Sequence, residues 1–417
     1  MPSYTKQDLE DYARKVEQKA AEFGLDHYEV VYEVCGHATM INRMAYSGVP
    51  FRYHHWSFGK AYDVINTSYT YGVGGLPYEM VINANPAIAY LMADNPLAVQ
   101  VLVMAHVLGH VNFFKHNYVF KKTYPQDALA SFKVHARRIN GFIDTYGISK
   151  VEKFLDAAKA LEFNTMRMVL LLEEGPIEPE EWKPRKKVEE PAEDILLFIR
   201  DHNPMLEPWQ KDVLTIVRDE ALYFLPQIET KIMNEGWATF WHYRIMNALE
   251  LPFDMQMEFL KLHNRIVQPS SGTVNPYALG FAIWQDLEGR MGLEELFSVM
   301  EANRDVSFVR QFLTRDIMER LHMFAYKKKG ASEVVIKEVA DEKGWKDVRE
   351  ELIRWVGVNS LPVIKIVDVE PDGMLVLKYF GDGRKLDPEY KEHTLRYVEL
   401  LWGNRVKMLE APVAKVS

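Results

Sequence analysis

The sequence predicts an α+β protein whose large N-terminal part is mainly helical with a few antiparallel strands, followed by a small mixed α+β module. Most of the chain carries apolar residues three and four positions apart, the spacing of amphipathic helices. Near the C-terminus, two β-branched runs flank Pro371-Asp372-Gly373, which is typical of a β-hairpin. We therefore expect one domain over residues 1–326 and a second over 331–417, with the KKKG sequence at 327–330 between them.

The first hundred residues predict one helix and several strands. The amphipathic pattern favours a helix over 5–22, and runs rich in Val, Ile and Tyr favour strands at 27–34, within 61–75, and at 78–86. Asn95-Pro96 then precedes a long apolar stretch. Because proline is favoured in the first turn of a helix, we expect a buried helix to begin there.

The remainder of the large domain is predicted to be helical, with one interruption. The interruption is the acidic, proline-rich stretch 173–194, whose composition is typical of a surface linker or insertion. The helices expected around it cover 126–172, 194–200, 208–224, a segment from Pro226 to about Leu249, and most of 251–326. In the C-terminal module a helix over 388–401 and a short strand at 405–409 follow the hairpin.

Composition excludes several classes of protein. The net charge of −9 argues against nucleic-acid binding, which needs a basic surface. The single cysteine, Cys35, excludes an internal disulfide framework and fits a reducing cytoplasm. The N-terminus lacks the apolar segment of a secretion signal. The apolar stretch 97–114 contains two His, a Gln and an Asn, so we expect a buried helix and not a membrane span.

Two histidines in this apolar stretch predict a metal site. His106 and His110 are four residues apart, so a helix places both on one face, one turn apart. Zinc peptidases of the zincin type use this spacing in their His-Glu-x-x-His motif. The alternative is a pair of hydrogen-bonded core histidines, since neutral imidazoles can be buried when they have partners.

A third ligand has to come from elsewhere in the chain. Glu235 lies in the sequence IMNEGWATFWH, which resembles the segment from which gluzincins supply a glutamate ligand on a later helix. Its neighbours are apolar and aromatic nearly all round, so the carboxylate is expected inside the protein and paired. The gap from His110 to Glu235 is longer than in gluzincins, which requires an insertion between the two ligand helices. A solvated glutamate is the competing interpretation.

The general base of the zincin motif is missing, because Val107 stands where the motif has glutamate. Glu220 and His242 are the candidate catalytic residues to replace it; His242 lies seven residues after Glu235, on the same helical face, and is also a candidate fourth ligand. An ordinary helical role explains either residue as well. The cluster of His, Trp, Lys and Tyr residues in 51–62 could line a site, and the favoured interpretation is a packed aromatic corner with one histidine facing solvent. Residues 268–280 form a turn-rich segment that could bind an anion, although no phosphate-loop pattern is complete.

Several motifs together resemble the stage V sporulation protein R (SpoVR) family. They are YHHWSFGK, YEMVINANP, AHVLGH followed by FFKHN, LEPWQKDVLTIVRDEALYFLPQ, TKIMNEGWATFWH and NPYALG, with LPVI and LLWGNRV near the C-terminus. They occur in order along essentially the whole chain. The resemblance implies that Val107 is a family trait, and that this chain is shorter than typical members near 173–194.

The resemblance also implies a biological setting. The family is linked to spore cortex formation, and hence to peptidoglycan or envelope processes. In organisms that do not sporulate it is expected alongside a serine protein kinase and a companion protein in stress conditions. These are the partners that the resemblance implies, together with a peptide or peptidoglycan-related substrate.

Three functional hypotheses follow. The first is a zincin-like hydrolase of a peptide or amide bond, with His106, His110 and Glu235 holding Zn²⁺. The second is a regulatory or scaffold protein with a structural metal or none. The third is an iron or manganese site that adds Glu220 and His242 to these ligands, against which stands the lack of a Glu-x-x-His pair on these helices.

Overall fold

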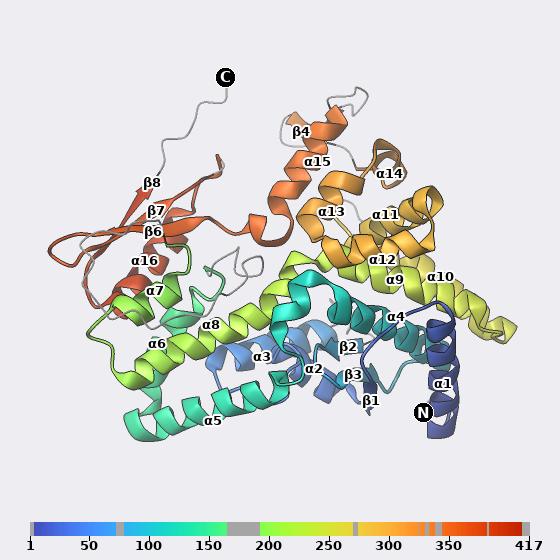
Figure 1. Cartoon of the computed structure of the whole chain (residues 1–417), viewed down its shortest axis with the longest axis horizontal. Helices are drawn as coiled ribbons and strands as arrows, with labels where there is room; N and C mark the ends of the chain where they lie inside the picture. The colour runs from blue at the N-terminus through green and yellow to red at the C-terminus, as the bar shows by residue number, and fades with distance from the viewer. Residues whose placement is uncertain are drawn as a thin grey trace. The chain divides into compact units, whose positions relative to one another are not determined.

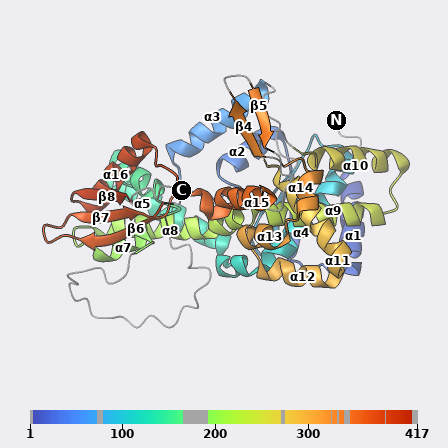
Figure 2. The same ribbon diagram turned by 90° about the horizontal axis from the view of Figure 1, so that it is seen from above.

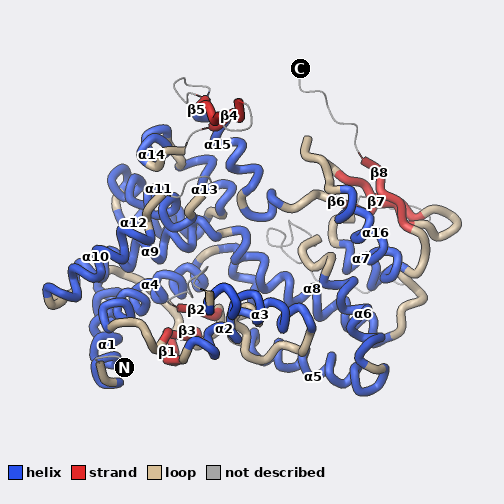
Figure 3. Tube along the Cα trace, turned by 180° about the vertical axis from the view of Figure 1, so that it is seen from behind, coloured by secondary structure: helices blue, strands red, loops and turns tan. Residues whose placement is uncertain are grey.

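The computed structural model describes residues 4–71, 79–164, 192–269, 274–323, 325–329, 333–337, 344–381 and 383–410 (Figure 1). Helices dominate these residues, and the strands form three small sheets (Figure 3). The α+β class predicted from the sequence is confirmed. Apart from residues 192–194, the acidic stretch at 173–194 lies outside the described residues.

The chain divides into two compact units. The first contains residues 1–131 and 227–357, and the second contains 132–226 and 358–417. Each unit is therefore assembled from two separate parts of the sequence. The boundary expected at 327–330 is a different division and stays a prediction.

The first unit holds most of the helices. Its N-terminal part contains α1 (Lys6–Glu22), β1 (Val30–Cys35), α2 (His37–Ala45), α3 (Trp56–Thr70), β2 (Glu79–Ile82), β3 (Ala87–Met92), α4 (Leu97–His116) and the short 3-10 helix η1 (Tyr118–Thr123). Its later part contains α9 (Lys231–Ala248), α10 (Phe253–Ile266), α11 (Pro276–Met291), α12 (Leu293–Ala302), α13 (Asp305–Phe312), α14 (Arg315–Arg320) and α15 (Gly344–Trp355). A two-stranded ribbon of β4 (Ala325–Lys329) and β5 (Glu333–Lys337) precedes α15 (Figure 2).

The second unit combines helices with the C-terminal sheet. Its helices are α5 (Ala128–Tyr146), which begins in the first unit, α6 (Ile148–Lys159), α7 (Ile195–His202), α8 (Pro208–Glu229), which ends in the first unit, and α16 (Pro388–Trp402). The 3-10 helix η2 (Gly357–Ser360) leads to β6 (Ile364–Val369), which pairs antiparallel with β7 (Leu375–Tyr379); β8 (Val406–Glu410) pairs parallel with β7. The hairpin predicted around Pro371-Asp372-Gly373 is confirmed.

The sheet of the first unit is mixed, in the order β1-β3-β2. β2 runs antiparallel to β3, as expected for the strands, but β1 runs parallel to β3, so the expectation of antiparallel strands is wrong for this pair. β3 itself was not predicted, since a short apolar run carries no period that separates a strand from a helix. The sheet packs against α4 through β3 and β2.

Two sequence expectations for local structure are corrected. Residues 61–70 belong to α3 and not to a strand, because the side chain of His55 accepts a hydrogen bond from Ser57 N and caps the helix, and its more buried residues recur three or four positions apart. Pro226 does not open a helix, because α8 continues through it to Glu229. The next helix, α9, begins at Lys231.

The aromatic corner expected in 51–62 is confirmed: Tyr53 and His55 are buried beside Phe58, and His54 is exposed.

The core of the first unit is built around α4 and α9, which lie side by side (Figure 1). α4 is long and apolar enough to cross a membrane, but 94% of its apolar window is buried inside the protein, as in the core helix of a soluble protein. Glycines permit the close packing. A Cβ on Gly109 of α4 would lie 2.7 Å from Ala238 Cα, and a Cβ on Gly236 of α9 would lie 2.4 Å from the backbone of Gly280 in α11. Three helices thus meet with little side-chain volume between them.

The N-terminus of α9 is held by a buried carboxylate from α13. Asp305 accepts hydrogen bonds from the backbone N–H groups of Ile232 and Met233, each at 2.8 Å. These groups have no partner inside the helix, so the carboxylate replaces an N-cap side chain. Burial nevertheless raises the pKa of Asp305 to about 8, although the two N–H groups act in the opposite direction. This contact fixes where α9 begins.

We predict that Gly236→Ala destabilises the protein by about 1–3 kcal/mol, because the added methyl group meets backbone atoms that cannot move aside cheaply. The matched control is Gly289→Ala on α11, where nothing lies within 4 Å of the added carbon. That substitution is expected to stabilise by about 0.5–1 kcal/mol through helix propensity. Chemical denaturation measures both; equal effects of the two substitutions would contradict the close packing.

Candidate metal centre

The two histidines of α4 are buried, and the Nδ1 atom of each contacts a side chain of α9. His106 is 3% exposed and His110 is 6% exposed. His106 Nδ1 lies 2.9 Å from His242 Nδ1, and His110 Nδ1 lies 2.8 Å from Asn234 Oδ1, both partners being on α9. Since an amide oxygen can only accept, His110 carries its proton on Nδ1 and has its lone pair on Nε2. Burial, and then the charge of His106, lower the pKa of His110 to about 4, so its ring is neutral near pH 7.

Glu235 of α9 faces the other nitrogen of both rings. Its Oε2 atom lies 3.5 Å from His110 Nε2 and 3.8 Å from His106 Nε2. Neither His106 Nε2 nor Glu235 Oε2 has a hydrogen-bond partner among the described residues, and both atoms are buried. Buried polar atoms are nearly always satisfied, so this arrangement needs an explanation. Burial raises the pKa of Glu235, but His106 and His110 outweigh it and hold the pKa below its ordinary value.

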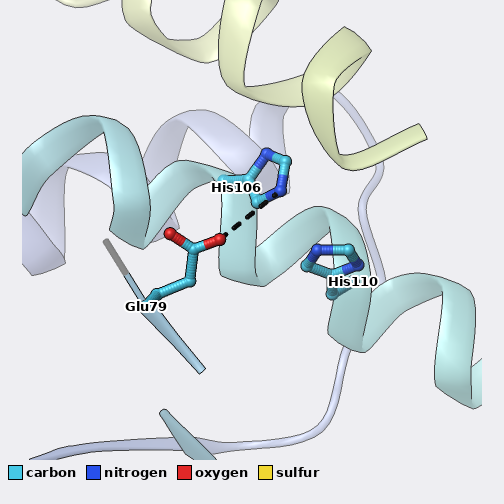
Figure 4. Close-up of side chains that lie close together, drawn as sticks. All are labelled: Glu79, His106 and His110. Carbon is cyan, nitrogen blue, oxygen red and sulfur yellow. Dashed lines mark ion pairs between the residues drawn. The ribbon is translucent and has the colours of Figure 1, made fainter. Parts of the chain in front are cut away.

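A second carboxylate comes from the sheet. Glu79, the first residue of β2, places Oε1 3.8 Å from His106 Nε2 (Figure 4). One oxygen of Glu79 and one nitrogen from each of His106 and His110 lie within 4.8 Å of one another. Burial raises the pKa of Glu79, with the charge of Glu235 adding to the rise and that of His106 opposing it. Sequence reasoning missed this residue, although a glutamate inside the apolar run YEMVINANP was an available signal.

Val107, which stands where the zincin motif has glutamate, is fully buried in the hydrophobic core of the first unit. A carboxylate at that position would enter the core. The carboxylates near His106 come from other elements, Glu79 from β2 and Glu235 from α9.

Tyr277, near the start of α11, is a further residue of the centre that sequence reasoning missed. Its ring stacks on that of His106 with centroids 6.2 Å apart. Burial, and then the charges of Glu235 and Glu79, raise the pKa of its hydroxyl far above the ordinary value. The hydroxyl therefore stays protonated and can donate a hydrogen bond. The signal was the motif NPYALG, which the sequence interpretation treated as an anion-binding turn; residues 270–273 of that turn lie outside the described residues.

His242 and Glu220, the two predicted catalytic residues, have different surroundings. His242 is fully buried and contacts His106 at Nδ1, the nitrogen opposite the one that faces Glu235. Glu220 belongs to the second unit, where its Oε1 atom lies 3.5 Å from Nδ1 of His135 on α5. The structure therefore brings His106, His110, Glu235 and His242 together.

The donor set fits a divalent metal ion. Imidazole nitrogens and carboxylate oxygens are ligands of zinc, and also of iron and manganese. Metal-bound histidines almost always donate from their second nitrogen to a nearby acceptor, as His110 does to Asn234. Two buried atoms without hydrogen-bond partners among the described residues, His106 Nε2 and Glu235 Oε2, face each other here at 3.8 Å. The residues present thus form a possible His/Glu metal site.

The chain belongs to the SpoVR family. The family model described as SpoVR like protein matches residues 3–181 and 172–361, and the model described as SpoVR-like C-terminal domain matches residues 362–411. This confirms the resemblance seen in the motifs. The first model matches in two segments that meet at 172–181, within the region where a shorter chain was expected.

A curated relative matches over nearly the full length. The protein YcgB of Escherichia coli (strain K12), described as uncharacterized, is 33% identical over 473 residues, which cover 98% of this chain and 92% of that protein. No solved structure matches the chain significantly. The comparisons therefore establish the family, and the chemistry has to be argued from the site.

The buried histidines predict a measurable pH dependence of stability in the metal-free protein. Burial lowers the pKa of His263, on α10, to about 4 from its ordinary 6.5. The unfolded chain therefore binds more protons between these values, so this contribution to stability is complete above pH 6.5 and is lost as the pH falls toward 4. The shift corresponds to about 3 kcal/mol.

His263→Asn removes this titration. We expect the difference in unfolding free energy between wild type and His263→Asn to shrink by up to about 3 kcal/mol from pH 7 to pH 4. The control is His393→Gln on α16, an exposed histidine, for which the difference should stay nearly constant. Denaturant titrations at several pH values provide the measurement, and a difference for His263→Asn that is independent of pH would refute the prediction.

Proposed function

We propose that this protein is a metal-dependent hydrolase with a zincin-like centre, in which His106, His110 and Glu235 hold one divalent ion. The observation that carries the proposal is the position of Glu235 Oε2, which lies 3.8 Å from His106 Nε2 and 3.5 Å from His110 Nε2. Glu235 Oε2 and His106 Nε2 are both buried without hydrogen-bond partners among the described residues. An ion between the three atoms would satisfy all of them. Zinc is the expected ion, and iron and manganese accept the same donors.

The likeness to zincins is proposed from the arrangement of the ligands. Two histidines one turn apart on a buried helix and a glutamate from a later helix are the ligand arrangement of that class. A bound divalent ion would supply Lewis-acid activation of water and of a carbonyl group. The other tasks of hydrolysis fall to the chain's own side chains.

Glu79 is proposed as the general base. It approaches the centre from β2, on a different element from the proposed ligands, and its carboxylate lies 3.8 Å from His106 Nε2. Its raised pKa suits a carboxylate that accepts a proton from water and passes it to a leaving amine. Tyr277, with its protonated hydroxyl, is proposed to donate a hydrogen bond to the oxygen on which charge develops.

The substrate class is proposed to be a peptide or amide. Family membership and the expected link to the spore cortex or cell envelope make peptides derived from peptidoglycan the first compounds to test. A serine protein kinase and its companion protein are the proposed partners.

Glu220 and His242, the catalytic residues predicted from the sequence, stay predictions in addition to Glu79.

A structural metal site is the second candidate, and one observation favours it. Glu79 Oε1 lies as far from His106 Nε2 as Glu235 Oε2 does, 3.8 Å in both cases. If both carboxylates bind the ion, the site has four protein ligands, which is typical of structural zinc. The protein would then regulate or scaffold other proteins and would not catalyse hydrolysis.

Two isosteric substitutions separate these candidates. We predict that Glu235→Gln loses the stoichiometric metal of the purified protein, because a ligand carboxylate is removed. Glu79→Gln should keep the metal and lower the rate of amide hydrolysis by about 10²–10⁴-fold, the range for loss of a general base. Metal content by mass spectrometry and turnover across a peptide and muropeptide panel are the two readouts.

The outcomes differ for each hypothesis. Loss of metal in both variants would favour the structural site. Wild-type protein that binds no divalent ion, even after incubation with Zn²⁺, Fe²⁺ or Mn²⁺, would overturn both. His116→Gln, at a partly buried position at the C-terminal end of α4, where the histidine contacts Asp26, is the matched control and should change neither readout.

A further inference from the structure

Three imidazoles from three helices form a continuous hydrogen-bonded chain behind the candidate metal centre. His106 Nδ1 of α4 lies 2.9 Å from His242 Nδ1 of α9, and His242 Nε2 lies 2.9 Å from His263 Nδ1 of α10. His242 is fully buried and His263 is 3% exposed. His242 takes part in both contacts, through Nδ1 in one and Nε2 in the other. A neutral imidazole has one N–H, so if His242 donates in one contact it must accept in the other.

When all three rings are neutral, only two arrangements of their protons give a donor and an acceptor in both hydrogen bonds. In the first, His106 donates from Nδ1 to His242, and His242 donates from Nε2 to His263. His106 Nε2 then carries the lone pair that faces Glu235. In the second, every proton moves to the other nitrogen, and His106 Nε2 carries a hydrogen that blocks a metal ion. If His263 Nδ1 is the acceptor, the tautomer of His106, two rings away, is therefore the first one.

Aromatic side chains surround the end of this row of three histidines. The ring of His263 contacts Tyr243, Phe259 and Phe281, with centroids 4.7, 6.0 and 5.0 Å away. His242 and His263 are both buried, and burial favours the neutral form of an imidazole, which carries one N–H. A histidine that merely filled the core would need one partner for its N–H; His242 uses both ring nitrogens in short contacts.

We propose that His242 and His263 are positioning residues that hold His106 in the tautomer whose Nε2 lone pair faces Glu235, and so raise the affinity of the centre for a divalent ion. This inference rests on the proposed metal centre. Carboxylates, carbonyl oxygens and water are the usual acceptors behind a metal-bound histidine. A neutral imidazole pair orients the ligand without adding charge. For His110 the corresponding acceptor is Asn234.

Breaking and conservative variants at the same positions test the proposal. His263→Phe fits the aromatic surroundings and removes the acceptor, so we expect the affinity for Zn²⁺ to fall by about tenfold; His242→Phe should lower it by about 10–100-fold. His263→Asn places an amide oxygen near the position of Nδ1 and should restore most of the affinity. His242→Gln, which offers both an acceptor and a donor, should also be closer to wild type than His242→Phe.

The measurement is a competition titration of the full-length protein with Zn²⁺ and a chromophoric chelator. Nitrogen NMR of labelled histidines in the metal-free protein reports the tautomer, and we expect proton occupancy on His106 Nδ1 in wild type and its loss in His263→Phe. If His242→Phe fails to fold, the His263 pair still decides the question. His116→Gln is the histidine control and should leave both readouts unchanged.

The possible results separate the two proposals. Wild type that binds no Zn²⁺ would overturn the metal centre, and with it the positioning role of His242 and His263. If wild type binds Zn²⁺ and His106→Ala reduces binding, but His263→Phe and His263→Asn behave alike, only the positioning role is overturned. A drop in affinity for His263→Phe that His263→Asn reverses, with the tautomer of His106 changing in parallel, supports the positioning role.

Discussion

The close packing of α9 between α4 and α11 sets the geometry of the whole candidate centre. Gly109 lies against Ala238, and Gly236 lies against Gly280, so the backbones approach until no further side chain fits between them. At this separation Glu235 reaches His106, three residues before Gly109, and His110, the residue after it. Asp305 fixes the start of α9 and hence the position of Glu235 along the helix. The polar groups of the centre are held by an apolar frame that leaves them little freedom.

The centre gathers polar groups in a region where each would be costly alone. Burying a neutral polar group without a hydrogen bond costs about 2–7 kcal/mol, and burying an unpaired carboxylate costs more. Here Asn234, His242 and His263 satisfy the ring nitrogens that point away from Glu235, while Glu235 and Glu79 lie at 3.5–3.8 Å from those that point toward it. Within the centre, the two buried atoms without partners, His106 Nε2 and Glu235 Oε2, face each other, which is the arrangement expected of a binding site.

Sequence reasoning succeeded where a pattern has a local cause. The spacing of His106 and His110 requires only a helix, and the aromatic flanks of Glu235 favoured burial, so the sequence predicted that these three residues meet. The structure brings them together, and their role as metal ligands stays a prediction. Glu79, Tyr277 and His263 were missed because their relevance depends on which elements pack together. The strand expected within 61–75 was wrong for residues 61–70 because Tyr, Val and Ile residues suit either element, and the cap by His55 favours the helix; residues 72–75 lie outside the described residues.

We propose that one divalent ion binds between α4, α9 and the start of β2. Anomalous diffraction from crystals of metal-loaded protein, recorded at the absorption edge of the bound metal, would locate this ion. A single strong peak is expected about 2 Å from His106 Nε2, His110 Nε2 and a carboxylate oxygen of Glu235. A metal-loaded protein whose peak lies elsewhere, or a map without a peak at this position, would contradict it.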